Sequence, residues 1–338
     1  TVENGTGTAT AKGSYILPTK VGTITVTATV ERTANYEGGS VTATVTIQPR
    51  RVTLAWEEDM EYVYNGEEQA PAARVIDLLD GDTCDVRVSG HKDAGQNLTA
   101  TATSLSNENY TLLGCTTLTA TFAIVPLKAE LAWSNFELVY NGKEQAPTAT
   151  VSNLIGADKC EVTVAGETNV GNDLVASAIN LSNPNYTLEG TTNLTATFAI
   201  KPLVADVVWT DTKLTYNAEE QAPTATVGNL CEGDSCLVTV SGAQINAGTY
   251  TATASSLSNP NYTLTGATDL TTTFTIERAK REVSLVESET VYGTSLTLTL
   301  AGNSENGSVS YQVSGGTGAA TMSGSVLTPT RAGEVVLT

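Results

Sequence analysis

Apolar and polar residues alternate along most of this chain with a period of two. The segments "TATVSNL" (148–154) and "TATFAI" (195–200) alternate Thr with Ala, Val or Phe. This period places one kind of side chain on each face of a β-strand, and β-branched Thr and Val fit a pleated surface. We find no segment that keeps the 3.6-residue period of a helix over about ten residues. The pattern therefore predicts an all-β chain.

Turn signals divide the alternating pattern into short strands. In residues 128–203 these signals are Asn141-Gly142, the loop around Gly156, and Asn183-Pro184-Asn185. Asn and Gly accept left-handed backbone angles and Pro fixes φ, so each signal is typical of a tight turn. Strands separated by turns roughly every 8–12 residues are typical of an antiparallel β-sandwich. We therefore expect about seven short antiparallel strands in this segment.

The same phrases recur at a fixed distance along the chain. "NENYTL" begins at Asn107, and "NPNYTL" begins at Asn183 and again at Asn259, a spacing of 76 residues (183 − 107 and 259 − 183). A second phrase, "VYNGEEQAP" at residue 63, returns as "VYNGKEQAP" at 139 and "TYNAEEQAP" at 215. A fixed period of this length indicates tandem structural repeats. We divide the chain into repeat unit 1 (51–127), repeat unit 2 (128–203) and repeat unit 3 (204–278).

Two aromatic positions recur in every unit and are predicted to lie in its core. A Trp ends an apolar run, and a Tyr begins the strand that follows the "NPN" turn. These residues are Trp56, Trp133, Trp209, Tyr110, Tyr186 and Tyr262. A buried Tyr ring whose hydroxyl bonds a neighbouring backbone group would hold this turn, which we call the corner, in one conformation. The alternative is that the tyrosines form an exposed platform for a sugar or a peptide.

The two ends of the chain resemble each other and not the repeat units. "GTGTATAKGSYILPTKVGTITVT" (5–27) aligns with "GTGAATMSGSVLTPTRAGEVVLT" (316–338) at an offset of 311 residues (316 − 5). We therefore interpret residues 1–50 as the C-terminal part, and residues 279–338 as the N-terminal part, of a second module type. The chain begins without Met, and we expect the natural protein to extend beyond both ends. Pro-containing junctions such as Val125-Pro126 restrict φ, so we expect the modules to form a stiff rod.

The net charge of the chain argues against nucleic acid as a partner. The 338 residues carry a net charge of −19. Such a surface repels nucleic acid, since few basic side chains are present to displace counterions from phosphates. We find no run of about 18 apolar residues, so we expect no membrane span in this segment.

The cysteines are the strongest candidates for specific chemistry. Cys231 and Cys236 flank the short turn "CEGDSC", and strand residues beside such a turn can reach disulfide distance. Cys84 and Cys115 form a second candidate pair if their strands are neighbours. The alternative is that these are small buried apolar residues. A zinc site is not expected, because His91 is the only histidine and no Cys-x-x-Cys occurs.

One acidic turn could in principle bind a cation. "DLLDGDTCD" holds Asp77, Asp80, Asp82 and Asp85, and alternating carboxylates can hold Ca²⁺. The equivalent turns of the other units lose most of these carboxylates. We therefore favour a solvated hairpin tip, and we expect no cofactor or metal.

The repeated phrases resemble a known class of module. The pattern "YNGxEQAPTATV … NPNYTLxG … TATFxI" is similar to the MBG and YDG-type repeats of large bacterial surface proteins. The end segments, with "PTKVGTITVTATVERTANY", resemble bacterial immunoglobulin-like modules of the same class. The resemblance implies tandem immunoglobulin-like β-sandwiches, an extracellular or cell-surface location, and a place in an adhesin stalk.

A structural role is therefore the function that we expect, with two alternatives left open. We expect a stalk or fibre segment whose partners are neighbouring repeats of the same chain. The first alternative is an array of modules that bind host glycan or mucin. The second is a subunit that self-associates into extracellular filaments. We do not expect an enzyme, because His91 lies in a polar loop absent from the other units and no catalytic motif recurs.

Overall fold

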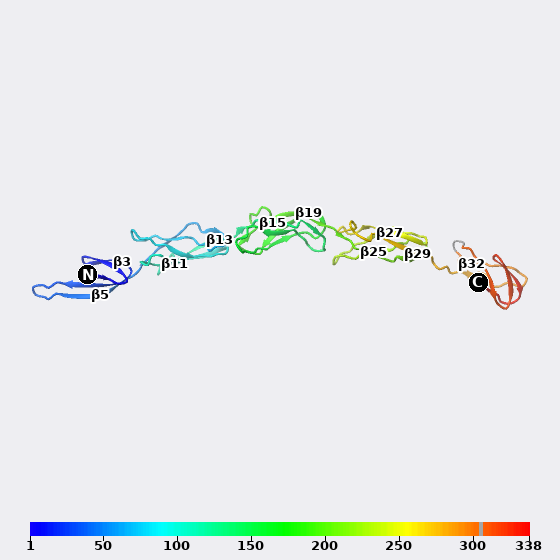
Figure 1. Ribbon diagram of the computed structural model, residues 1–338, viewed down its shortest axis with the longest axis horizontal. Coiled ribbons are helices and arrows are strands. Elements are labelled where there is room, and N and C mark those ends of the chain that lie inside the picture. The colour runs from blue at the N-terminus through cyan, green and yellow to red at the C-terminus, as the bar shows by residue number, and fades with distance from the viewer. Residues whose placement is uncertain (304–306) are drawn as a thin grey trace. The chain divides into compact units, whose positions relative to one another are not determined.

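A computed structural model describes residues 1–303 and 307–338. The chain divides into two compact parts, Thr1–Pro202 and Leu203–Thr338, which are described separately below. Strands are the only regular elements in these described ranges, so the expectation of an all-β chain is confirmed (Figure 1). No helix long and apolar enough to cross a membrane occurs among the described residues.

Each repeat unit contributes eight strands in the same order, and the first strand of each begins one residue before the boundary expected from the sequence. Unit 1 comprises β6 (Arg50–Arg51), β7 (Leu54–Trp56), β8 (Glu61–Val63), β9 (Ala73–Val75), β10 (Val86–Ser89), β11 (Gly95–Leu105), β12 (Tyr110–Thr111) and β13 (Thr119–Val125). Unit 2 comprises β14 (Leu127–Lys128), β15 (Leu131–Ser134), β16 (Glu137–Val139), β17 (Thr148–Val151), β18 (Val162–Ala165), β19 (Gly171–Leu181), β20 (Tyr186–Thr187) and β21 (Thr195–Lys201). Unit 3 comprises β22 (Leu203–Val204), β23 (Val207–Thr210), β24 (Lys213–Thr215), β25 (Thr224–Val227), β26 (Val238–Ser241), β27 (Gly248–Leu257), β28 (Tyr262–Thr263) and β29 (Thr271–Glu277). The prediction of three tandem repeat units is confirmed.

The strands of each unit form one four-stranded sheet and two short pairs. In unit 1 the large sheet has the order β10-β11-β13-β8, and β7 pairs with β9 while β12 pairs with β6. The other two units repeat this arrangement strand for strand. The β9 strand also touches the segment before β10 through a single bridge between Arg74 and Asp85.

The expectation of purely antiparallel sheets is wrong for two strand pairs in every unit. β13 runs parallel to β8, and β12 runs parallel to β6. Parallel neighbours need a long crossover connection, and here most of the unit lies between β8 and β13. The alternating pattern reveals where strands lie but carries no information on which distant strands become neighbours. The sheets are therefore mixed.

The core of each unit is built from alternate residues of its two longest strands. In β13, Phe122 and Ile124 are buried, whereas the threonines before them are exposed and Ala123 between them is half-buried. In the neighbouring strand β11, Ala100 and Ala102 are also buried, and Ala100 is fully inaccessible. Because alanine is small, the sheet can lie close to the residues that pack against it. Alternation of Thr with Ala is therefore enough to form one face of the core. The same four positions are buried in units 2 and 3.

The N-terminal segment (1–50) forms five strands. They are β1 (Val2–Asn4), β2 (Thr8–Lys12), β3 (Tyr15–Lys20), β4 (Gly22–Val30) and β5 (Gly39–Ile47). β1, β4 and β5 form one sheet, and β2 and β3 form a hairpin.

The described residues of the C-terminal segment (279–303 and 307–338) form seven short strands. They are β30 (Ser284–Leu285), β31 (Leu296–Thr297), β32 (Leu300–Ala301), β33 (Val313–Gly315), β34 (Ala319–Ser323), β35 (Val326–Arg331) and β36 (Val336–Leu337). They pair as β30-β32, β31-β35-β34 and β33-β36.

Candidate functional site

The "NPNYTL" corner of each unit is hydrogen-bonded to another turn of the same unit, the one that corresponds to "DLLDGDTCD" in unit 1. In unit 2 the Asn183 side-chain oxygen accepts a 3.0 Å hydrogen bond from the Asn185 amide, which closes a tight Asx turn. The Asn183 side-chain nitrogen donates to the Lys159 carbonyl at 3.1 Å. Units 1 and 3 repeat both bonds at Asn107 and Asn259. The corner and the acidic turn therefore form one structural element.

The structure places the corner tyrosines in the core. Tyr110, Tyr186 and Tyr262 are only 5%, 4% and 4% exposed, so they form no exposed platform for a ligand. In unit 2 the Tyr186 hydroxyl accepts a 2.7 Å bond from the Ile155 amide and donates a 2.8 Å bond to Asp158 Oδ2. Burial is the main reason that the pKa of Tyr186 is raised, and the bond to Asp158 raises it further.

The acceptor of each corner tyrosine is an aspartate that the sequence analysis did not single out as a repeated position. Asp82 of unit 1 and Asp234 of unit 3 accept from their own corner tyrosines at 2.6 Å and 2.7 Å. The signal was present, because Asp82, Asp158 and Asp234 share the 76-residue spacing (158 − 82 and 234 − 158). Asp82, considered above as a cation ligand, therefore has a structural partner.

The three tryptophans are half-buried, and each fastens two distant parts of its unit. The indole nitrogen of Trp133 donates to the Asn193 carbonyl at 3.0 Å. Trp56 donates to the Thr117 carbonyl at 2.9 Å, and Trp209 donates to the Asp269 carbonyl at 2.8 Å. Each indole thus joins the short antiparallel strand pair that contains it to the loop before the last strand of the unit.

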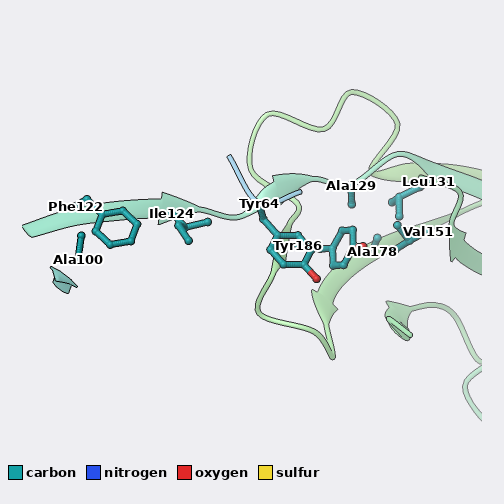
Figure 2. Packing of buried hydrophobic residues seen from close by; sticks show 9 residues of the cluster. All are labelled: Tyr64, Ala100, Phe122, Ile124, Ala129, Leu131, Val151, Ala178 and Tyr186. Atoms are coloured by element: carbon teal, nitrogen blue, oxygen red, sulfur yellow. The ribbon is translucent and has the colours of Figure 1, made fainter. Parts of the chain in front are cut away.

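The junction between units 1 and 2 carries the most specific contacts in the first part of the chain. Tyr64 of unit 1 is 2% exposed, and its hydroxyl donates a 2.8 Å hydrogen bond to Asp158 of unit 2. Its ring meets the Tyr186 ring edge to face, with centroids 5.8 Å apart and an interplanar angle of 70°. Figure 2 shows the two rings side by side between the buried residues of unit 1 and those of unit 2. Asp158 thus accepts from two tyrosines that belong to different units.

The environment of Tyr64 favours its neutral form. Burial, followed by the hydrogen bond to Asp158, raises the pKa of Tyr64 to about 12. Deprotonation of Tyr64 would place a negative phenolate beside a carboxylate in a buried site, and this is unfavourable. The junction is therefore assembled from a protonated Tyr64.

A buried asparagine makes the second set of contacts at this junction. The Asn185 side-chain oxygen accepts a 2.7 Å bond from the Ala94 amide of unit 1. Its side-chain nitrogen donates a 2.9 Å bond to Asp93 of unit 1. Asn185 is 8% exposed, so both ends of its amide are satisfied by the neighbouring unit. Asn185 belongs to the "NPNYTL" phrase, which therefore also serves as the contact surface for the preceding unit.

The segment that connects the two units, Val125-Pro126-Leu127, is hydrogen-bonded to both of them. Val125 accepts a 2.9 Å bond from the Tyr64 amide in unit 1. After Pro126, the Leu127 amide donates to the Asn185 carbonyl of unit 2 at 2.8 Å. The only residue between these two anchors is a proline, whose φ is fixed.

The N-terminal segment uses the equivalent asparagine of unit 1 in the same way. Asn109 accepts a 2.9 Å bond from the Val21 amide, as Asn185 accepts one from Ala94. Lys20 adds a 2.9 Å ion pair with Glu108, although both side chains are largely exposed. An exposed pair of this kind contributes little, roughly 0–1 kcal/mol. The Asn109 contact is therefore the more specific of the two.

All five cysteines are free thiols in the structure. Cys84 and Cys115 pack against the same apolar cluster of unit 1, which contains Leu54 and Tyr110. Cys236 is 8% exposed, and Cys231 lies in the turn that is bonded to Tyr262. The disulfides Cys231–Cys236 and Cys84–Cys115 stay predictions.

Asp77 and His91, which were also considered in the sequence analysis, make backbone contacts within unit 1. Asp77 accepts the Thr53 amide at 3.0 Å and 3.1 Å, and His91 forms an isolated bridge with Gln69. Within residues 1–303 and 307–338 no group of three or more His, Cys, Asp and Glu side chains is placed to hold a metal ion.

Comparison with known proteins adds no family to this description. No family model matches the chain, and a search of curated proteins finds no match.

Proposed function

We propose that this chain is a segment of the stalk or fibre of a large repetitive protein displayed on the outside of a bacterium. In this proposal each repeat unit is an immunoglobulin-like sandwich module whose partners are the neighbouring modules of the same chain. The role is mechanical: the modules hold another part of the protein at a distance and resist unfolding. The proposal assigns no catalytic step to the chain.

The observation that carries the proposal is the junction between units 1 and 2. Tyr64 and Asn185 are buried there, and their polar atoms are bonded across the unit boundary. A flexible string of modules would leave such a boundary solvated and free of specific contacts. Buried and fully bonded polar groups restrict the boundary to one arrangement, because breaking it leaves them without partners. Stiffness at the boundary is the property that a stalk needs.

The strand pairing within a unit also suits a load-bearing role. Tension that leaves unit 2 passes through β21, which is paired in parallel with β16. The Tyr140 amide donates to the Lys201 carbonyl at 2.9 Å, and the Ala199 amide donates to the Phe136 carbonyl at 2.9 Å. Sliding β21 out of the sheet must break these bonds together and not one after another. The same parallel pair occurs in units 1 and 3.

Surface charge supports the same role. A net charge of −19 keeps repeated modules soluble and discourages them from adhering to one another along their sides. The acidic residues are spread over all three units, as expected of a solvated surface.

Pulling single molecules from both ends tests the proposal. Three similar unfolding events are expected, each releasing about 270 Å of chain, from 76 residues at roughly 3.6 Å per residue. Forces well above those that unfold helical bundles would support a mechanical role. Unfolding at negligible force, together with a defined hit on a glycan array, would contradict the stalk proposal and favour a binding array.

A further inference from the structure

The turn that follows Tyr64 fits closely against unit 2. Gly66 in this turn has a left-handed backbone with φ 80°. A Cβ at this position would lie 2.5 Å from Cγ2 of Ile155 in unit 2. Carbon atoms that are not bonded to each other pack at roughly 3.5–4.0 Å. Gly66 therefore leaves the space that the Ile155 side chain occupies.

Ile155 is held in place by its own unit and by the junction. Its amide donates a 2.7 Å bond to the Tyr186 hydroxyl, and its carbonyl accepts a 3.0 Å bond from the Asp158 amide. Its half-buried side chain packs against the apolar cluster that contains Tyr64 and Tyr186. Ile155 therefore cannot move away from Gly66 without disturbing the contacts that join the two units.

Unit 3 keeps this turn but not its glycine. In units 1 and 3 the asparagine before this position accepts a 2.9 Å bond from the amide two residues later, so the turn has the same form. Unit 2 carries Gly142 at this position with φ 77°, whereas unit 3 carries Ala218 with φ 66°. The left-handed conformation is unfavourable for a residue with a Cβ. The methyl group of Ala218 also fills the space that unit 1 leaves for Ile155.

A second difference lies in the loop that carries Ala94, a partner of Asn185. An isolated bridge at His91 marks the start of this loop in unit 1. In unit 3 the bridge is at Gln244, an offset of 153 residues (244 − 91), whereas twice the repeat spacing is 152 (2 × 76). The loop of unit 3 therefore gains one residue at its start. Gly242 before it has φ 97°, whereas the corresponding glycines of units 1 and 2 are not left-handed.

The connection to the next module differs as well. Units 1 and 2 end with Pro126 and Pro202, and Arg278 occupies the same position in unit 3 (278 − 202 and 202 − 126 are both 76). Proline fixes φ, and arginine does not. Three features of the junction between units 1 and 2 thus change together at one end of unit 3. The buried corner and core of unit 3, with Tyr262 and Phe274, are unchanged.

We propose that the end of each repeat unit that faces the next module determines which type of module can follow it. Units 1 and 2 accept the corner of another repeat unit beside Gly66 or Gly142. Unit 3, with Ala218 and the longer loop, does not accept a repeat unit and is followed by a module of the second type. A repeat unit gained or lost before unit 3 leaves matched neighbours, whereas one added after unit 3 does not.

Substitution of Gly66 in the full chain tests the steric part of the proposal. Gly66→Ala copies Ala218 into unit 1, and hydrogen exchange at the Ala94 amide is expected to accelerate at least roughly tenfold. Gly81→Ala is the matched control, because Gly81 is also left-handed, with φ 86°, but no atom lies within 4 Å of a Cβ there. This control is expected to change exchange at Ala94 by less than about twofold.

A second background separates the clash from backbone strain. Ile155→Ala removes the obstructing methyl group, and in this background Gly66→Ala is expected to accelerate exchange at Ala94 by less than about twofold. Equal effects of Gly66→Ala and Gly81→Ala, or an undiminished effect of Gly66→Ala in the Ile155→Ala background, overturn the proposal.

A rearranged full-length chain tests the selection itself. Residues 127–202 and 203–278 exchange places, so that unit 2 follows unit 3. Peptides from β19 and β21 of unit 2 are expected to exchange hydrogen at least roughly tenfold faster than in the natural order. Restoring the three features, by Ala218→Gly, Arg278→Pro and deletion of Ala243, is expected to recover the protection.

The outcome of the rearrangement is decisive in both directions. Unchanged protection of unit 2 after unit 3, or no recovery when the three features are restored, overturns the proposal. Recovery by the restored features alone supports it. Neither result bears on the stalk role, which the pulling experiment tests independently.

Discussion

Tyr64 and Asp158 belong to different repeat units, yet the tyrosine hydroxyl donates a 2.8 Å hydrogen bond to the carboxylate. Asp158 accepts a second bond of the same length from Tyr186 of its own unit. One carboxylate thus fixes both the corner of its own unit and the neighbour that packs against it. The stability of unit 2 and the order of the junction are therefore coupled.

Removal of the Tyr64 hydroxyl is expected to weaken this coupling. Tyr64→Phe keeps the ring and its contact with Tyr186 but loses a hydrogen bond to a charged group, at a cost of about 1.5–3 kcal/mol. Chemical denaturation followed by tryptophan fluorescence measures the change in the free energy of unfolding.

Tyr62→Phe is the matched control for this variant. Its ring is half-buried, and its hydroxyl donates a 2.7 Å bond to the exposed carboxylate of Glu57 in the same unit. We expect a loss of less than about 1 kcal/mol and no change in the cooperativity between units. Equal effects of the two variants would contradict a special role for the Tyr64 contact.

Alkaline conditions are expected to destabilise the junction. The pKa of Tyr64 is raised to about 12 by burial and by Asp158, whereas an exposed tyrosine in the unfolded chain titrates near 10. The folded state therefore holds the proton more tightly, and its contribution to stability is complete below pH ~10 and lost as the pH rises towards ~12. A pH series of unfolding curves checks this. Tyr64→Phe should flatten the decline, although the raised pKa values of Tyr62 and the corner tyrosines leave part of it in place.

Replacement of Asn185 should loosen the junction without unfolding either unit. Asn185→Ala leaves the Ala94 amide and the Asp93 carboxylate without their partner, which costs about 1–3 kcal/mol. Hydrogen exchange at the Ala94 amide is expected to accelerate. Asn141→Ala, at the equivalent exposed turn of unit 2 where Asn141 accepts the Lys143 amide, serves as the control. Unchanged protection of Ala94 would show that the bond does not hold the junction.

A core substitution in unit 2 should leave unit 3 intact. Phe198→Ala removes a ring that is 2% exposed and leaves a cavity, at a cost of about 3–5 kcal/mol. Because each unit has its own four-stranded sheet, unit 3 should keep its unfolding transition while unit 2 loses stability. Calorimetry separates the transitions. Loss of all three together would argue against units that fold independently.

Oxidation of the cysteines is detected by mass. If Cys231 and Cys236 form a disulfide, the intact mass under non-reducing conditions falls by about 2 Da, and peptide mapping joins the two positions. In the reduced chain, alkylation is expected to be slowest at Cys236, which is 8% exposed, and faster at the half-buried cysteines. Slower alkylation of Cys231 than of Cys236 would contradict this order.

The alternating Thr–Ala and Thr–Val pattern was enough to predict an all-β chain, and the 76-residue spacing of the repeated phrases was enough to predict three repeats. The corner tyrosines predicted to lie in the core are buried there. The parallel pairing of β8 with β13 could not be predicted, because strand neighbours distant in sequence are chosen by packing and not by local pattern.

The contacts between units 1 and 2 could not be predicted from the sequence either. The spacing of "NPNYTL" revealed a structural corner but not its second role, since Asn185 reaches a loop 91 residues earlier in the chain. Asp158 was overlooked because its neighbours in the acidic turn differ between units. A comparison of single positions at the 76-residue spacing, and not of whole phrases, would have singled it out.

Each repeat unit carries both sides of the junction found between units 1 and 2: a Tyr at the Tyr64 position and an Asn-Tyr corner with its Asp. A gene that gains or loses 76 codons in frame would therefore still encode matching neighbours. Deleting residues 128–203, for example, would present Asp234 and Tyr262 to Tyr64 in place of Asp158 and Tyr186. Such a shortened chain is expected to fold with a cooperative transition, whereas a deletion ten residues longer is not. We therefore expect the chain to tolerate a change of length in steps of one repeat unit better than a change of any other size.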